Sequence, residues 1–559
     1  MVARTAKVTQ AMAATALLAS SALWTMPTAV AIEPPKVDVG AVPPDGPPSP
    51  PETMRQGAYC TRVGTLPGTD YRVQPKYMDM LNLPEAWRFG RGAGIKVAII
   101  DTGVSPHPRL PNLVGGGDYV VAGGDGLSDC DAHGTWVASL IGAFPADGKT
   151  PLPPPLQTRR PDTVPTEDKP PPPPPPQTVT VQVPAPPPPP PPEPPSGWHG
   201  GGQTHTIRPA GGHVPPPSAP SEPTPPAPPA PPPPPGPPVP AADGFSGVAP
   251  DVQIISIRQS SMAFSPKDAF GGDQDPATRR KAGDIRSMAR AIVHAANMGA
   301  QVINLSEVSC MSALNVIDQR DLGAAIRYAA IDRNVVIVAA AGNSSNNDCK
   351  PNPIYNALRP NDPRDWAGVT TVVTPAWFSD YVLTVGAVDS SGAPLTQLSI
   401  AGPWVSIAAP GTDMQSLSPR DDGLINASEG RDNTMVAPAG TSFSAAIVSG
   451  VAALVRAKYP NLTSHQVISR LIRTARPPAR GVDNQIGHGI VDPVAALTYD
   501  VPPGEAAPPE RLSAPLAVAR PVPPRNMTPV WAAMAGIAAV AAGSVVTVGA
   551  ASLMRSRSR

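Results

Sequence analysis

The sequence predicts a three-layer α/β/α protein with a mainly parallel sheet, a long Pro-rich insertion and one C-terminal transmembrane helix. Short apolar runs rich in β-branched residues alternate with segments of helical periodicity. This alternation is typical of parallel strands that are covered by helices on both faces. The runs occupy residues 96–100, 252–257, 302–305, 335–339, 382–388 and 405–408, and the helical patterns occupy residues 285–298 and 322–332.

Polar residues follow two of the predicted strands. Asp101 ends the run at 96–100, and Asn343 comes shortly after the run at 335–339. The carboxyl ends of parallel strands form the edge at which ligands gather, so we expect both side chains at a functional edge. Before the first strand, a short helix is expected around residues 77–87.

Proline is concentrated in one part of the chain. Of the 83 prolines among 559 residues, 41 lie between residues 151 and 240. Runs of proline favour an extended conformation with little apolar surface to bury, so residues 145–242 are predicted to form an exposed, disordered insertion. A docking segment for a polyproline-binding partner or the cell wall is the alternative. The net charge of zero gives no general attraction to nucleic acid.

The first 31 residues are typical of a secretory signal peptide. Arg4 and Lys7 precede an apolar run at residues 11–26, and Ala29-Val30-Ala31 has the small-residue pattern of a cleavage site. Export with cleavage after Ala31 is therefore expected. The alternative is a retained N-terminal anchor.

A second apolar segment, predicted at residues 530–554, is long enough to cross a membrane. Residues 531–554 carry no charge and would extend roughly 36 Å as a helix, against a hydrocarbon core of about 30 Å. Arginines 555, 557 and 559 follow in a short tail at 555–559. The positive-inside rule places that tail in the cytoplasm and the preceding domain outside the cell membrane. A buried soluble helix, the alternative, would need partner surface all around it.

Four cysteines, at positions 60, 130, 310 and 349, show no zinc-site spacing. An exported domain lies in an oxidising compartment, which favours two disulfides. The residues themselves leave the pairing open. The remaining boundaries place an N-terminal extension at 32–75, the main domain at 76–500 and a Pro-rich linker at 501–529.

Three short segments carry the residues of a serine nucleophile site. Asp101 lies in VAIIDTGV, His133 begins an apolar helical pattern in DAHGTWVASLIG, and Ser442 begins another in GTSFSAAIVSG. A serine hydroxyl needs a base to remove its proton, and His133 would be that base with Asp101 orienting it. Each residue alone is better explained as a turn, a structural histidine or a helix cap. Their combination in one order favours a protease.

Asn343 in VAAAGN completes the predicted site. Its side-chain amide, with the Ser442 amide, would stabilise an oxyanion. Gly134 and Gly440 allow close backbone approach. An esterase with a GxSxG elbow and the order Ser, Asp, His does not fit these segments.

Through DTGV, HGTWVAS, AAAGN and GTSFSAA, residues 60–500 resemble the subtilisin family of serine proteases, the subtilases of peptidase family S8. The signal peptide, cysteine-bearing extension, Pro-rich tail and C-terminal anchor further resemble the mycosins, membrane-anchored proteases of mycobacterial type VII secretion systems. The proline insertion resembles the branch that serves the fifth of these systems. The resemblance implies disulfides Cys60–Cys130 and Cys310–Cys349, of which the first would tether the extension beside the active site.

The resemblance also implies that the segment after VINLS lines the specificity pocket, so Ser306, Glu307 and Gly342 are predicted to contact substrate. Val308 stands where glycine is common, which predicts a narrow cleft. Glu307 would select basic residues or, in the simpler interpretation, face solvent. No cofactor and no metal ligand is predicted.

Two functions follow from the resemblance. The first is an endopeptidase of narrow specificity that cleaves exported proteins in association with a type VII secretion membrane complex. The second is a structural subunit of that complex whose proteolysis is dispensable.

Overall fold

The computed structural model describes residues 32–165, 239–267, 275–345, 348–354, 358, 361–479, 481–513 and 527–557. The predicted signal peptide, residues 166–238 of the insertion, residues 514–526 of the linker and the last two residues of the basic tail lie outside the described residues.

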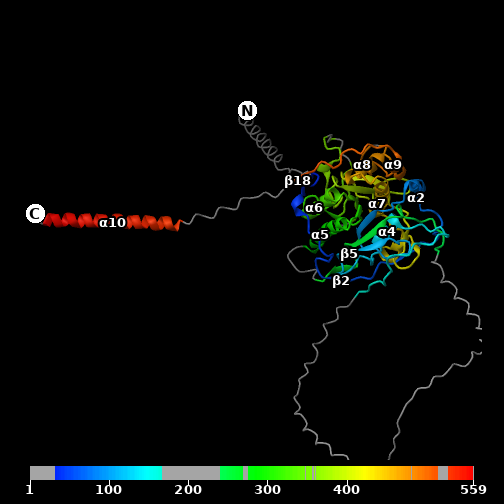
Figure 1. Cartoon of the computed structure of the whole chain (residues 1–559), viewed down its shortest axis with the longest axis horizontal. Helices are drawn as coiled ribbons and strands as arrows, with labels where there is room; N and C mark the ends of the chain where they lie inside the picture. The colour runs from blue at the N-terminus through cyan, green and yellow to red at the C-terminus, as the bar shows by residue number, and fades with distance from the viewer. Residues whose placement is uncertain are drawn as a thin grey trace, which may run out of the picture.

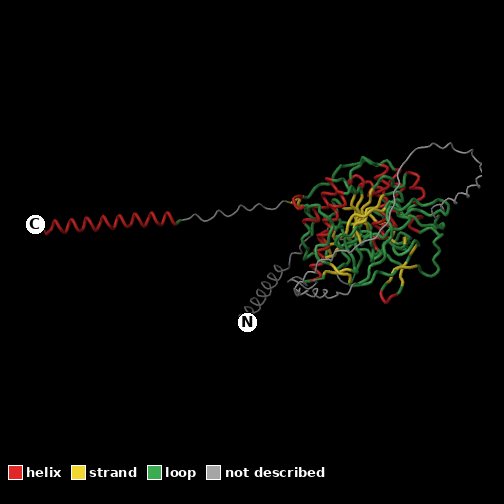
Figure 2. The backbone as a smooth tube through the Cα atoms, turned by 60° about the horizontal axis from the view of Figure 1, so that its bottom comes forward, coloured by secondary structure: helices red, strands yellow, loops and turns green. Residues whose placement is uncertain are grey.

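A sheet of seven parallel strands lies at the centre of the described body (Figures 1 and 2). Its strand order is β13-β12-β10-β8-β4-β6-β5, and every neighbouring pair is parallel. The strands are β4 (Lys96–Asp101), β5 (Leu113–Asp118), β6 (Gln253–Arg258), β8 (Val302–Leu305), β10 (Val336–Ala340), β12 (Val382–Val388) and β13 (Val405–Pro410). The predicted parallel sheet is confirmed.

Helices cover both faces of the sheet, so the layers are α/β/α. One face carries α4 (His133–Gly142), α7 (Thr441–Lys458) and α8 (Ser464–Thr474), and the other carries α5 (Pro276–Asn297) and α6 (Arg320–Arg327). Alternate residues of β4 divide between two apolar cores. Val97 and Ile99 join the core of α4 and α7, whereas Ala98 and Ile100 join the core of α5 and α6, as the two-residue period of a strand requires.

Shorter elements complete the body. The helices are α2 (Lys76–Met80), α3 (Leu83–Ala86), α9 (Pro493–Thr498), the π-helix η3 (Tyr328–Asp332) and the 3-10 turns η1 (Val39–Ala41), η2 (Trp87–Phe89), η4 (Trp366–Gly368) and η5 (Arg431–Asn433). The strands are β1 (Val37–Asp38), β2 (Met54–Gln56), β3 (Val63–Gly64), β7 (Phe264–Pro266), β9 (Ser309–Ser312), β11 (Thr371–Thr374), β14 (Ser416–Leu417), β15 (Leu424–Ile425), β16 (Ala427–Glu429), β17 (Met435–Val436) and β18 (Leu512–Ser513).

Two helices differ from their predicted bounds. The helix expected around 77–87 is divided between α2 and α3, because Asn82 adopts the left-handed conformation with φ of 49°. Helix α5 begins well before residue 285. The carboxylate of Asp275 accepts a hydrogen bond from the amide of Thr278 at 2.9 Å and caps the longer helix.

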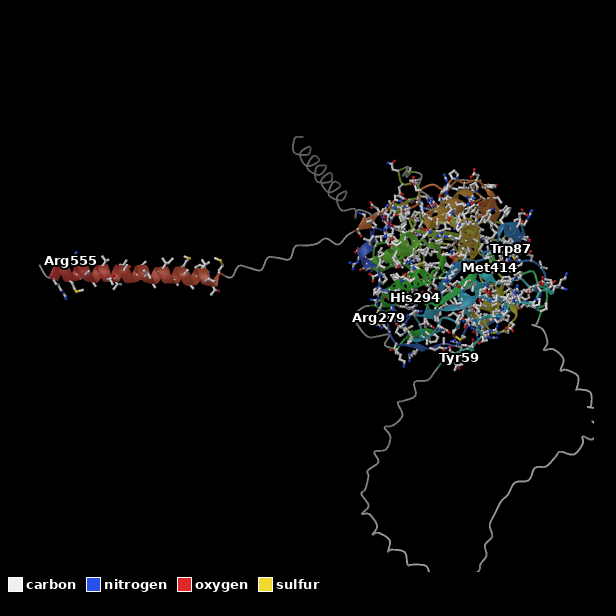
Figure 3. All side chains as sticks on the ribbon, viewed as in Figure 1. Tyr59, Trp87, Arg279, His294, Met414 and Arg555 are labelled. Carbon is white, nitrogen blue, oxygen red and sulfur yellow. A yellow bond between two sulfur atoms is a disulfide. The ribbon has the colours of Figure 1, made fainter. Side chains whose placement is uncertain are left out.

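The N-terminal extension, residues 32–75, is attached to the body at several separate places. Its strands β1, β2 and β3 pair with β18, β7 and β16. Asp45 also lies 2.9 Å from Nδ1 of His294 on α5, and Figure 3 labels His294 on the body. A disulfide joins Cys60 to Cys130. The extension is therefore held by backbone pairing, charge and a covalent bond.

Arg109 holds the two ends of the Pro-rich insertion together. Its guanidinium donates to the carbonyl of Phe144 at 2.6 Å, before the insertion, and to the carbonyl of Phe245 at 2.5 Å, after it. The same group pairs with Asp243 at 2.7 Å. Since Arg109 is only 4% exposed, the root of the insertion is part of the folded body.

The first part of the insertion also follows the body surface, although most of its side chains are exposed. Arg159 pairs with Asp422 at 2.7 Å, and Arg160 pairs with Asp125 at 2.5 Å. Charged side chains between the proline runs therefore find partners on the body, while residues 145–165 stay largely exposed.

The C-terminal part of the chain pairs with its beginning. Strand β18 lies parallel to β1, with Val37 opposite Leu512. Beyond it lies α10 (Thr528–Arg557), whose most apolar 18-residue stretch has a mean hydropathy of 1.9 and is not buried. Figure 1 draws α10 apart from the body. By length and composition this helix can cross a membrane.

Removing the guanidinium at the insertion root tests its structural role. Arg109→Met leaves the half-buried Asp243 carboxylate without its partner, and we expect the free energy of unfolding to fall by about 3–5 kcal/mol. Urea denaturation of the full chain in detergent would measure it. The double variant Arg109→Met, Asp243→Asn removes the unpaired charge and should recover part of the loss. Equal stability of the single and double variants would contradict this account.

Candidate active site

Asp101 and His133 meet at the carboxyl end of the central strand β4. Asp101 is the last residue of β4 and is fully buried, and His133 is the first residue of α4. Nδ1 of His133 lies 2.7 Å from Oδ1 of Asp101, which also accepts the amide of Thr102 at 2.7 Å. The structure thus joins the predicted base to its predicted orienting carboxylate.

A second buried carboxylate fixes the spacing between β4 and α4. Asp129 accepts from the hydroxyl of Thr102 at 2.8 Å and from the amide and hydroxyl of Thr135 at 2.7 and 2.6 Å. Burial raises the pKa of Asp129 to about 6 against these hydrogen bonds, and the charge of Asp101 adds to the rise. Asp129 therefore links the residue after Asp101 to the first turn of α4 and so helps to hold Asp101 and His133 at a fixed separation.

The chain enters α4 through a constrained turn. Ala132 has φ of 67° and therefore lies in the left-handed region, which non-glycine residues rarely occupy. A Cβ on Gly134 would lie 2.0 Å from the carbonyl oxygen of Gly103, so only glycine fits there. The Cys60–Cys130 disulfide and a hydrogen bond from the amide of Thr61 to the carbonyl of Cys130 (2.8 Å) hold the approach to this turn.

Ser442 lies in the first turn of α7, where backbone amides are free to bind an anion. It is 6% exposed, and its hydroxyl donates to the carbonyl of Ser306 at 3.3 Å. The Ser306 hydroxyl in turn contacts Oδ1 of Asn304 at 2.8 Å. Among the hydrogen bonds of the described residues, none joins Ser442 to His133. The serine is thus held at the site in a resting orientation.

Asn343 is oriented by the residue before the serine. Its Oδ1 accepts from the amide and the hydroxyl of Thr441, each at 3.0 Å. The carbonyl oxygen of the side chain is therefore occupied, and its amino group stays available to a developing oxyanion. A Cβ on Gly440 would come within 3.0 Å of that nitrogen, so glycine keeps the space open.

The predicted substrate segment lies beside these groups. Gly342 has φ of 99°, and a Cβ there would lie 3.1 Å from Ile400, 3.2 Å from Val373 and 3.6 Å from Val308. These neighbours are apolar, so the surroundings of Gly342 are narrow and hydrophobic. The Cys310–Cys349 disulfide closes a loop that begins in β9, and β9 pairs with β11, which follows that loop in the sequence.

Glu307 does not simply face solvent. Its side chain is 36% exposed, and Oε1 lies 3.5 Å from Nδ1 of His133. Burial opposes the charged imidazole, but Asp101, then Glu307 and Asp129, outweigh it and raise the pKa of His133 to about 10. Burial raises the pKa of Glu307 to about 7, an effect that the charge of His133 opposes and that of Asp101 reinforces.

Donor atoms of Asp101, His133 and Glu307 lie within 4.8 Å of one another, as close as ligands in a metal site. Nδ1 of His133 is already hydrogen-bonded to Asp101. We therefore assign these groups to proton chemistry and propose no metal there.

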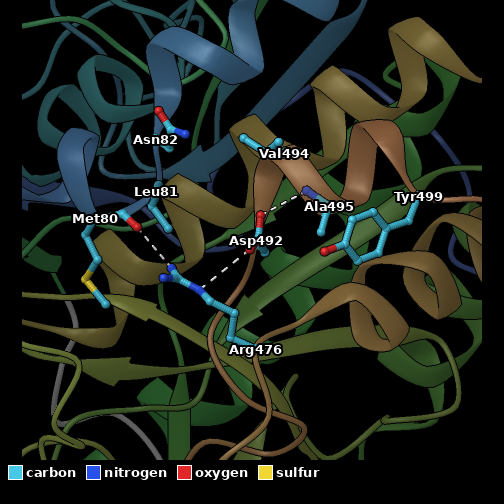
Figure 4. A pocket seen from close by; sticks show the side chains of 8 residues that line it. All are labelled: Met80, Leu81, Asn82, Arg476, Asp492, Val494, Ala495 and Tyr499. Atoms are coloured by element: carbon cyan, nitrogen blue, oxygen red, sulfur yellow. Dashed lines mark hydrogen bonds and ion pairs between the residues drawn. The ribbon is translucent and has the colours of Figure 1, made fainter.

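A pocket of about 320 Å³ lies away from this site, between α2 and α9 (Figure 4). Arg476 crosses it, donating to the carbonyl of Met80 at 3.1 Å and lying 3.8 Å from Asp492. The pocket shares no lining residue with the candidate catalytic groups, and its arginine already has partners. It is therefore not a candidate for the substrate cleft.

Sequence reasoning missed the groups that hold the site together. Asp129 and Thr135 flank His133 in the segment DCDAHGT, and Thr441 precedes Ser442. The close spacing of Asp129, Asp131 and His133 was the signal by which Asp129 could have been found. The roles of the two threonines depend on contacts across the fold that no local spacing predicts.

Known proteins are similar to this chain in both sequence and fold. The Peptidase S8, subtilase family model matches residues 186–489. Mycosin-5 of Mycobacterium tuberculosis is 62% identical, covering 98% of this chain and 96% of that protein, and Mycosin-2 of the same organism is 50% identical over 98% of each.

Solved structures agree with these relatives. A chain in the structure of an intact ESX-5 inner membrane complex is 57% identical, with a TM-score of 0.69, covering 93% of this chain and all of that one. The crystal structure of MycP1 from Mycobacterium smegmatis is 39% identical, with a TM-score of 0.66, covering 86% and 99%. The chain is therefore a serine endopeptidase of the subtilase family and belongs to the mycosins.

Proposed function

We propose that this chain is a membrane-anchored endopeptidase that cleaves a small set of exported proteins through an acyl-enzyme, in association with a type VII secretion membrane complex. The observation that carries the proposal is the 2.7 Å contact between His133 and Asp101 at the end of β4, opposite a serine in the first turn of α7. These are the parts of a serine protease triad.

In the proposed mechanism, the Ser442 hydroxyl turns from the Ser306 carbonyl to Nε2 of His133 when substrate binds. His133 accepts the proton as Ser442 attacks the substrate carbonyl, and Asp101 stabilises the imidazolium through Nδ1. His133 then returns the proton to the leaving amine. Water repeats the sequence on the acyl-enzyme and restores the free serine.

The oxyanion formed in each step would be stabilised by the Asn343 amino group and the Ser442 amide. Both donors are fixed before the reaction: Thr441 holds the Asn343 side chain, and the start of α7 holds the amide. Preorganised donors stabilise the transition state without the cost of reorientation. Asn343 is therefore proposed as a catalytic residue.

Narrow specificity is supported by the surroundings of Gly342. Val308, Val373 and Ile400 limit the space there, which favours a small apolar residue on the acyl side of the scissile bond. Ser306 and Gly342 would contact substrate through their backbone.

The proposed topology places the body outside the cell membrane and the arginine tail inside. Helix α10 has the length and hydropathy of a membrane span, with arginine at its end. The pairing of β1 with β18 brings the end of the predicted signal peptide and the start of the linker to one edge of the body. That edge is proposed to face the membrane.

A structural role in the secretion complex is the second candidate. The full-length match to a chain of the ESX-5 inner membrane complex favours it, and the ordered extension and insertion root offer surface beyond what catalysis needs. The two roles are compatible, and the next experiment separates them.

Replacing the nucleophile while keeping the fold distinguishes the roles. With Ser442→Ala expressed in place of the native chain, we expect specific exported proteins to lose a cleaved N-terminus, while secretion itself continues. Mass spectrometry of N-termini in the culture medium measures both. Deletion of the whole gene is the control for the structural role. An unchanged set of N-termini would contradict the protease role.

Asn343→Ala tests the oxyanion role. We expect kcat to fall by about 100- to 1000-fold with little change in KM, because the lost interaction exists mainly in the transition state. Kinetics on a peptide taken from the N-terminal survey measure this. Asn315→Ala, an exposed asparagine elsewhere, is the matched control. A fall confined to KM would assign Asn343 to substrate binding instead.

Val308→Ala tests the narrow cleft. Widening it should raise kcat/KM for peptides with a large residue before the scissile bond by about tenfold relative to the small-residue peptide, since each methylene in such a pocket is worth about 1–3 kcal/mol. Val316→Ala, at a valine that is 36% exposed, should leave the ratio unchanged. An unchanged ratio in Val308→Ala would place the specificity pocket elsewhere.

A further inference from the structure

His133 faces two carboxylates at one nitrogen. Oδ1 of Asp101 lies 2.7 Å from Nδ1, and Oε1 of Glu307 lies 3.5 Å from the same atom. A triad needs one orienting carboxylate. Glu307 is therefore an additional charge whose presence at the imidazole requires an explanation.

The contact with Glu307 is electrostatic. Nδ1 carries a single proton, and the shorter contact assigns that proton to Asp101. Glu307 consequently accepts no hydrogen bond from Nδ1 and acts through its negative charge alone. A negative charge at this distance favours the imidazolium over the neutral ring. A histidine must be neutral to accept a proton from serine, so Glu307 opposes the first step of the reaction.

Most of the charged groups around Glu307 are negative, so its own negative charge has little compensation. It contacts His133 on α4, and the charges of Asp101 on β4, Asp131 before α4 and Asp284 on α5 also act on it. His133 is the only cation among them. Asp131 is itself held by the hydroxyl of Ser261 and the amide of Met262. A cation that entered this region would thus be attracted by several carboxylates, and it can reach Glu307 because that side chain is 36% exposed.

Glu307 is also within reach of a bound peptide. It follows Ser306, whose carbonyl accepts the hydroxyl of Ser442 at 3.3 Å. A long basic side chain of a residue beside the scissile bond can therefore extend to Glu307. Pairing would neutralise Glu307 and place a positive charge near the imidazolium, and both effects favour release of its proton to solvent.

We propose that Glu307 makes catalysis dependent on a basic substrate: a Lys or Arg side chain near the scissile bond, at a position other than that of the small apolar residue on the acyl side, pairs with Glu307 and frees His133 to act as the base. This inference rests on the proposed function of His133 and Ser442. Glu307 is in this view a specificity-determining and positioning residue. It keeps the site slow toward peptides that lack the cation.

The test uses diisopropyl fluorophosphate, a neutral reagent that phosphorylates an activated serine with loss of fluoride and needs no knowledge of the substrate. The full-length chain is kept in detergent with EDTA, and the rate of labelling of Ser442 is followed by mass spectrometry from pH 5.5 to 10. Ser442→Ala gives the background. For Glu307→Gln we expect the labelling rate to reach half its maximum at a pH about one unit lower than in the wild type, because a nearby negative charge has been removed.

Butylguanidinium, which mimics an arginine side chain, is the second arm. At pH 8, above the pKa of about 7 to which burial raises Glu307, it should accelerate labelling of the wild type at least about threefold and have no effect on Glu307→Gln, which has lost the charge that pairs with the reagent. Glu307→Asp keeps the charge and should retain part of the response. Glu85→Gln, at a surface glutamate on α3 that pairs with Arg88 within the described part of the chain, is the matched control and should behave as wild type.

The outcomes are separable. A wild type that is not labelled at any pH overturns the proposed function and the inference with it. A labelled wild type whose pH profile coincides with that of Glu307→Gln overturns the inference alone, as does equal acceleration of both by butylguanidinium. Melting temperatures within about 2 °C across the variants would exclude loss of fold as the cause.

Discussion

The proposed chemistry depends on one buried contact, the hydrogen bond between Asp101 and His133. Asp101 has no exposed surface, and its Oδ2 has no hydrogen-bond partner among the described residues. A carboxylate in such a place is unfavourable unless other groups compensate it. The imidazole and the amide of Thr102 do so on one oxygen only, so the geometry must be imposed by the surroundings. Asp129, between β4 and α4, and the Cys60–Cys130 disulfide supply that constraint.

This constraint explains how a long insertion can separate His133 from Ser442 in the sequence. The site belongs to the sheet, because Asp101 ends β4 and the helices α4 and α7 pack on its neighbours. The insertion leaves the body near Phe144 and returns at Phe245, and Arg109 bonds to both carbonyls. Whatever the intervening residues do, the two ends are fixed by the same buried side chain. The positions of β4, α4 and α7, which carry the candidate catalytic residues, therefore do not depend on the length of the insertion.

The sequence predicted the elements whose signal is local. Parallel strands appear as apolar runs, and the triad candidates stand at element ends with their own glycines. What it could not predict are contacts between remote segments. Thr441 orients Asn343, and Arg109 joins two ends of a long loop, yet neither pair has a fixed spacing. Glu307 belongs to the predicted substrate segment, but its approach to His133 depends on how β8 lies beside β4. The first 31 residues lie outside the described structure, so the signal peptide stays a prediction.

The position of Glu307 changes how narrow specificity can arise in this fold. The proposed steric limits around Gly342 would exclude large residues on the acyl side of the scissile bond, but one methylene discriminates only modestly. A charge that suppresses the general base acts differently, because it lowers the rate for every substrate that fails to neutralise it. Recognition and catalysis then share one electrostatic interaction, and a protease positioned beside a stream of exported proteins would spare those without a basic residue at the cleavage site. In this proposal the selectivity lies in the protonation state of His133, which shape alone cannot set.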